Sequence, residues 1–158
     1  MPCDPSPAFR QQIVALARDW IGTPFQHQGR LKGVGVDCAG LVIGVTRELG
    51  LAPEDRPTYG HAPDRYVLGE MLDRQARLKG RDGACAEPGD LLLFWVSDRR
   101  YPQHLGIATG RQNGDLMMVH AYARPGKNKL NKVLEMPLGP YFYSRLVAVY
   151  AIPGGTHG

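Results

Sequence analysis

The sequence is poor in cysteine and has no long apolar run. Its three cysteines cannot all pair, and none stands in the Cys-x-x-Cys spacing of a zinc or redox motif, so at least one thiol is free. A membrane span needs about 20 apolar residues, and no stretch of the chain approaches that length. The sequence therefore predicts no membrane span and no disulfide framework.

A secretory signal is also missing from the N-terminal residues. They read MPCDPSPAFRQQ, without the charged start and apolar segment of a signal peptide. We therefore expect synthesis in the cytoplasm without a signal peptide. Delivery to any external substrate must then depend on something else.

The positive charge of the chain is mild and dispersed. A net charge of +4 and a pI near 9.1 favour approach to anionic surfaces. The basic residues are spread along the chain, pairs such as Arg99-Arg100 fit a solvated loop, and no nucleic-acid-binding motif accompanies them. We expect no nucleic-acid partner.

Helical patterns dominate the first half of the chain. At 158 residues the length fits a single domain over 1–158, with its core at about 6–153. Ser6 and Pro7 form a helix start, and apolar residues then recur at helical spacing as far as Gly22. Further helices are predicted at 38–49, closed by Gly50, and at 64–79.

Strand patterns follow in the second half. They cover 90–96, 104–109, 116–123, 132–136 and 146–152, and Asn113-Gly114 predicts a tight hairpin between the second and third. Helices followed by consecutive strands indicate an α+β domain, in which an antiparallel sheet packs against the helices.

Cys38 is a candidate nucleophile. Asp37 caps the predicted helix and leaves Cys38 in the first turn, where backbone N–H groups and the helix dipole favour a thiolate. Gly40 lacks a side chain that could hinder a substrate oxyanion near those N–H groups. The alternative is that Cys38 is a small buried hydrophobic residue.

Two of the five histidines lie on predicted strands. His104 opens one strand, and alternation places Gly106 and Ala108 on its face. His120 lies across the Asn113-Gly114 hairpin, where it could hydrogen-bond the second ring nitrogen of His104. Each could instead be a core histidine bonded to backbone. Together with Cys38 they predict a nucleophile, a base and an orienting group.

Five segments resemble the NlpC/P60 cysteine peptidases in order and spacing. They are WIGTPF (20–25), GVDCAGLV (35–42), PGDLLLF (88–94), HLGI (104–107) and VHA (119–121). The resemblance spans about residues 9–152 and is nearest to the single-domain forms encoded with phage tails and gene transfer agents.

This resemblance implies a papain-like fold and hydrolysis of peptidoglycan stem peptides, typically between D-glutamate and diaminopimelate. It assigns Cys38 as nucleophile, His104 as base and His120 as orienting residue, with Asp37, Ala39, Gly40 and Phe25 at the substrate end. Many relatives have Ser where this chain has Ala39 and Tyr where it has Phe25. The implied partners are the wall peptide and tail hub or baseplate proteins, the implied location is a phage-like particle acting on the wall, and no cofactor is expected.

Three other interpretations stay open at this point. The same three residues would serve an N-acetylmuramoyl amidase or an acyltransferase. A catalytically idle tail-tip or assembly protein could keep the fold for docking alone. Cys38, His104 and His120 could also hold a catalytic zinc, although we expect no metal.

Overall fold

A computed structural model describes residues 4–55, 67–124 and 131–154. Its elements are α1 (Pro7–Asp19), β1 (Arg30–Leu31), β2 (Gly35–Val36), α2 (Cys38–Glu48), α3 (Val67–Gln75), β3 (Arg77–Gly80), the 3₁₀ turn η1 (Gly83–Cys85), β4 (Leu91–Phe94), β5 (His104–Gln112), β6 (Asp115–Tyr122), β7 (Lys132–Pro137), α4 (Gly139–Tyr143) and β8 (Leu146–Ala151). Within these ranges no helix has the length and apolar character that a membrane crossing needs.

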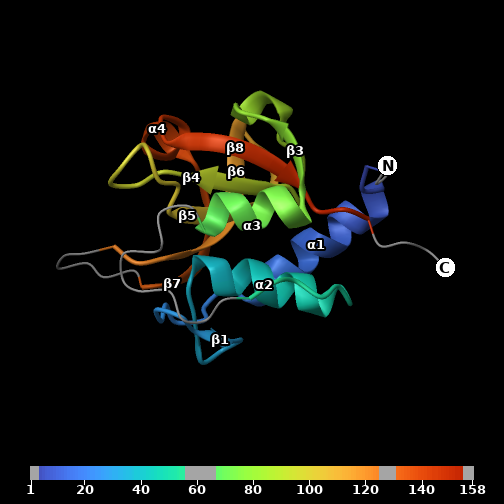
Figure 1. Ribbon diagram of the computed structural model, residues 1–158, viewed down its shortest axis with the longest axis vertical. Coiled ribbons are helices and arrows are strands. Elements are labelled where there is room, and N and C mark those ends of the chain that lie inside the picture. The colour runs from blue at the N-terminus through green and yellow to red at the C-terminus, as the bar shows by residue number, and fades with distance from the viewer. Residues whose placement is uncertain (1–3, 56–66, 125–130, 155–158) are drawn as a thin grey trace.

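A six-stranded sheet forms the centre of the fold. Its strand order is β3-β8-β4-β5-β6-β7, and every neighbouring pair is antiparallel. Figure 1 shows α1 and α2 together below the sheet, with α4 at the opposite side. Helices packed on an antiparallel sheet confirm the predicted α+β class.

The two faces of the sheet bury separate apolar clusters. Because side chains alternate along a strand, Leu91 and Leu93 of β4 pack with α1, α2 and α3, whereas Leu92 and Phe94 pack with Phe142 of α4. We call these the helix-side cluster and the α4-side cluster. A residue's position in its strand therefore decides which cluster it joins.

The first helix begins as predicted. The Ser6 side chain accepts a hydrogen bond from the Phe9 N–H at 3.1 Å, and Pro7 occupies the first turn. Trp20, just after the helix, is 3% exposed, and its indole N–H donates to Glu48 of α2 at 2.6 Å. The indole thereby fastens α1 to α2, which carries Cys38.

The helix predicted at 64–79 is wrong at its C-terminal end. Residues 67–75 are helical, but Arg77–Gly80 form β3 and pair with β8 at the edge of the sheet. Leu78, which fitted the helical pattern, is 44% exposed. Residues 64–66 lie outside the described residues. Backbone hydrogen bonds to β8 therefore determine the structure of residues 77–80, although the helical spacing of apolar residues continues to Leu78.

Gly44 of α2 gives a test of this packing. A Cβ at this position would overlap the Trp20 ring, so we expect Gly44→Ala to lower the free energy of unfolding by about 1–3 kcal/mol. Gly69 of α3 is the matched control, because nothing lies within 4 Å of its added Cβ. Gly69→Ala should be neutral or stabilise by up to about 1 kcal/mol, since alanine is the better helix former. Denaturant unfolding of both variants measures the difference, and equal effects would contradict this packing.

Candidate active site

Asp37 organises the N-terminus of α2. One carboxylate oxygen accepts hydrogen bonds from the Gly40 N–H at 2.8 Å and from Arg30 at 3.0 Å. The other accepts from the Gln28 N–H at 2.9 Å. The side chain is 6% exposed, so its oxygens are engaged within the protein. Its predicted capping role is confirmed, while a contact with substrate stays a prediction.

Gly40 has a packing role at the start of α2. Its N–H is committed to Asp37, and a Cβ on it would overlap the Gly29 carbonyl oxygen and approach Val36 to 2.8 Å. The missing side chain therefore lets the loop before α2 pack closely on the helix. Whether Gly40 also borders a substrate stays a prediction.

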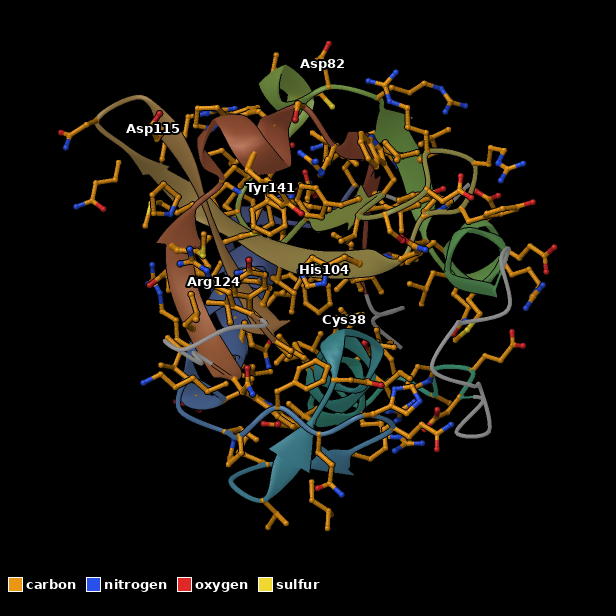
Figure 2. The ribbon with its side chains drawn as sticks, turned by 90° about the vertical axis from the view of Figure 1, so that its left-hand side faces the viewer. Cys38, Asp82, His104, Asp115, Arg124 and Tyr141 are labelled. Atoms are coloured by element: carbon orange, nitrogen blue, oxygen red, sulfur yellow. The ribbon has the colours of Figure 1, made fainter. Side chains whose placement is uncertain are left out.

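The sulfur of Cys38 meets the beginning of β5. Its Sγ donates to the Gln103 carbonyl at 3.8 Å, and the backbone N–H of Leu105 interacts with the same sulfur. These two residues flank His104 in the chain. Figure 2 shows Cys38 at the end of α2, with His104 on the strand above it. Among the described residues, the sulfur has no hydrogen bond to the imidazole itself.

The surroundings of Cys38 favour the neutral thiol. Burial raises its pKa to about 12, and the negative charge of Asp37 adds to this rise. The N–H groups of Leu105, Ala39 and Cys38 lower the pKa, as expected at a helix N-terminus, but their effect is smaller. The expectation of a resting thiolate is therefore wrong, and a base must take the proton during any attack.

The structure joins the two predicted histidines directly. His104 Nε2 lies 2.7 Å from His120 Nδ1, with both rings buried. His120 Nε2 is buried and has no hydrogen-bond partner in the described part of the chain. Since Nε2 of His104 is engaged by His120, Nδ1 is the nitrogen left for a proton from Cys38.

A one-residue bulge in β5 makes this contact possible. Ile107 pairs with Val119 and Ala108 with Met118, but beyond Thr109 the register shifts so that Gly110 pairs with Met117. If the register at the turn continued along β5 without this bulge, Ile107 would pair with His120, and His104 and His120 would point to opposite faces of the sheet. The turn at Asn113 and Gly114, both with positive φ as predicted for a tight hairpin, connects the strands.

Aromatic rings enclose the histidine pair. The His104 ring packs against Phe94 and Phe142 at centroid distances of 5.9 and 5.7 Å, and Tyr122 stacks on His120 at 5.1 Å. Loss of water lowers the pKa of His104 to about 4, and burial together with the charge of His104 lowers that of His120 further. Both imidazoles are therefore neutral at pH 7.

Gly106 and Ala108 lie on the face of His104, as predicted, but this is not the face on which α2 packs. Gly106 and Ala108 share the strand face of the α4-side cluster, whereas α2 packs on the other face through Leu105. Cys38 instead approaches the first residue of the strand. The beginning of β5 is therefore the meeting point of thiol and imidazole.

Two further predicted residues border this site. Ala39 is 6% exposed within the helix-side cluster, and Phe25 is half-buried against that cluster. Ala39 and Leu105 also line an apolar cavity of about 360 Å³ between α2 and α3. Periodicity alone did not indicate the cavity, because it depends on how the two helices pack. Whether Ala39 and Phe25 contact a substrate stays a prediction.

The described residues contain no group of three His, Cys, Asp or Glu side chains arranged to hold a metal ion. Zinc held by Cys38, His104 and His120 therefore has no support in this geometry. The chemistry that remains is proton transfer between a thiol and a hydrogen-bonded imidazole pair.

Comparison with solved structures places this fold among NlpC/P60 domains. An NLP/P60-family protein from Staphylococcus aureus matches with a TM-score of 0.67 and 18% identity, over 98% of this chain and 44% of its own. The NlpC/P60 domain of the peptidoglycan hydrolase SagA matches with a TM-score of 0.57 and 22% identity, over 90% and 97%. A wild-type endolysin matches with a TM-score of 0.52 and 16% identity, over 93% and 65%.

These likenesses define the fold as that of the NlpC/P60 domains. The chain spans less than half the length of the Staphylococcus aureus protein that it matches. No family model matches the sequence, and no curated protein matches it.

Asp37→Asn separates the capping of α2 by this carboxylate from the effect of its charge on the pKa of Cys38. Asparagine keeps an acceptor for the Gly40 N–H but removes the charge, so we expect the pKa of Cys38 to fall while unfolding becomes easier. The pH dependence of iodoacetamide alkylation at Cys38 measures the shift, in a background with Cys3 and Cys85 changed to serine.

Asp55→Asn is the matched control. Asp55 also pairs with Arg30, but its charge does not contribute to the pKa shift of Cys38. The control should lower stability and leave the alkylation profile unchanged. Equal shifts in both variants would contradict a direct effect of Asp37 on the sulfur.

Proposed function

We propose that this protein is a cysteine peptidase that hydrolyses peptide bonds in bacterial peptidoglycan. The supporting observation is the placement of the Cys38 sulfur against the backbone on both sides of His104, whose ring is hydrogen-bonded to His120. An NlpC/P60 fold carries this arrangement.

The reaction starts from the neutral pair of thiol and imidazole. The thiol hydrogen turns from the Gln103 carbonyl to Nδ1 of His104, and the resulting thiolate attacks the substrate carbonyl carbon. His104 then protonates the leaving amine, which leaves a thioester on Cys38. Water, deprotonated by His104, hydrolyses this thioester and regenerates the thiol. His120 accepts from Nε2–H of His104 and holds the ring in the reactive tautomer.

Backbone N–H groups at the tip of α2 stabilise the tetrahedral oxyanion. The Gly40 N–H is committed to Asp37, which leaves the N–H groups of Cys38 and Ala39. These groups already interact with the sulfur and lower its pKa. Loss of one such donor typically reduces the rate about 10²- to 10³-fold.

The preferred bond in this proposal is D-glutamate to diaminopimelate in the stem peptide. The proposed setting is the tail of a phage or gene transfer agent, bound to hub or baseplate proteins, from which the enzyme reaches the wall. The bond preference and the tail setting are both supported by the sequence resemblance rather than by the shared fold.

One observation favours a second candidate, an idle docking protein of the same fold. The thiol of Cys38 has a raised pKa and bonds to a carbonyl oxygen rather than to His104. Such a protein would bind its partners without cutting the wall.

Cys38→Ala distinguishes the peptidase from the idle docking protein. We expect this variant to fold with unchanged stability and to lose all wall hydrolysis, because the nucleophile is gone. Cys85→Ala is the matched control and should retain full activity, since Cys85 ends η1 and its thiol, within the described residues, bonds to the Asp82 carbonyl alone.

Mass spectrometry of products from purified peptidoglycan is the measurement. A new free amine on diaminopimelate supports the endopeptidase, and a whole released stem peptide indicates an amidase. Hydrolysis that survives Cys38→Ala, or an inactive wild-type protein, would overturn the proposal.

The pH profile is a separate test of His104 as base. His104 must be neutral to accept the thiol proton, and burial lowers its pKa to about 4. The acid limb of kcat/KM should therefore lie near pH 4, well below the value near 6.5 of a free imidazole. Stopped assays on a soluble stem peptide between pH 3.5 and 8, at about half-unit steps, locate the limb. A limb near 6.5 would show that another group controls the reaction.

A further inference from the structure

Two arginine side chains near the candidate site are stacked on aromatic rings. Arg145 lies with its guanidinium carbon 3.8 Å from the centroid of Tyr141 and 4.6 Å from that of Trp95. Arg99 lies over the same Trp95 ring at 5.2 Å. We call Trp95, Arg99, Tyr141 and Arg145 the arginine–aromatic cluster. Its members come from the loop after β4, from α4 and from the residue before β8.

The positive charges of this cluster are not neutralised by the described residues. Neither Arg99 nor Arg145 forms an ion pair there, whereas the adjacent Arg100 pairs with Asp98 at 2.9 Å. Nη1 of Arg145 donates to the Tyr141 carbonyl at 3.1 Å and to the Ser144 hydroxyl at 3.3 Å, and its Nη2 has no acceptor in the described part of the chain. Two guanidinium groups therefore have no anionic partner among residues 4–55, 67–124 and 131–154.

The cluster adjoins the histidine pair through its chain neighbours. Trp95 directly follows Phe94, and Tyr141 directly precedes Phe142, and both phenylalanine rings pack on His104. Tyr141 is 47% exposed. In the view of Figure 2, the labels of Cys38, His104 and Tyr141 follow one another from the tip of α2 towards α4. The Tyr141 ring packs on Phe142 at 5.0 Å, so the cluster lies next to the aromatic rings that enclose His104.

We propose that the arginine–aromatic cluster is a binding subsite for a carboxylate group of the wall peptide. This inference rests on the proposed function, because it takes peptidoglycan as the substrate. A guanidinium fork matches a carboxylate in geometry and charge. Stacking between Trp95 and Tyr141 holds the plane of Arg145, so less side-chain entropy is lost when the anion binds.

Binding to insoluble peptidoglycan tests the subsite without catalysis. All proteins carry Cys38→Ala, and the probe is purified peptidoglycan, either native or with its carboxylates amidated. We expect Arg99→Gln and Arg145→Gln each to weaken binding to native wall roughly three- to tenfold. Amidation of the wall should weaken its binding to the parent by a similar factor. Binding to the two variants should change little further, because their interaction with the carboxylate is already lost.

Arg18→Gln is the matched control, with the same loss of charge on α1. Arg18 pairs with Glu135, and Figure 1 shows α1 well separated from α4. Its binding should equal that of the parent. Arg99 is exposed and no hydrogen bond of its side chain is found in the described residues, so Arg99→Gln decides the question if Arg145→Gln proves unstable in thermal unfolding.

Three results would overturn the subsite. They are variants that bind native wall as tightly as Arg18→Gln, amidation that weakens parent and variants equally, and duplex DNA that binds as tightly as wall and with the same dependence on both arginines. The last would indicate a general polyanion surface. If the Cys38→Ala parent binds wall but the protein with Cys38 intact cuts no peptide bond, the peptidase proposal fails and the subsite proposal stands.

Discussion

The contact between the first turn of α2 and the beginning of β5 is the constraint on which the candidate site depends. It joins Cys38 to the carbonyl of Gln103, the residue before His104 and 65 positions further along the chain. Trp20 fixes α2 to α1, and the sheet fixes β5 between β4 and β6. Small changes in how α2 lies on the sheet would therefore move the thiol relative to the imidazole.

Asp37 illustrates a compromise at this contact. Its carboxylate caps α2 and pairs with Arg30, which secures the loop before the helix. The same negative charge raises the pKa of the neighbouring thiol. Helix position is thus stabilised at the expense of thiolate formation, and the neutral His104 and His120 pair supplies the base that such a thiol needs.

The elements of this fold were largely predictable, because they follow from local patterns. Ser6 and Asp37 indicated where two helices begin, and Asn113-Gly114 indicated the hairpin. The edge strand at 77–80 was not predictable, since it exists only through pairing with β8, near the other end of the chain. The short helix α4 was missed as well, and its Phe142 becomes meaningful only when the sheet places it on His104.

Within the site, residue identity was easier to predict than environment. Cys38, His104 and His120 stood out by type and position, and the structure brings the two imidazoles into direct contact. Their surroundings were harder to foresee, because burial changes pKa values through the summed packing of distant side chains. The packing role of Gly40 was not foreseen either, since the approach of the Gly29 carbonyl oxygen has no local sequence signature.

The bulge at Thr109 divides the β5–β6 hairpin into two parts with different tolerance to length changes. Since side-chain direction alternates residue by residue, His104 and His120 share a face because of the register that Ile107 and Val119 set at their end of the hairpin. A single insertion or deletion between His104 and Ile107 would turn His104 to the far side of the sheet unless a new bulge absorbed it. Length changes at the bulge or in the reverse turn leave that part of the ladder in register, and length variation in this hairpin should therefore concentrate there.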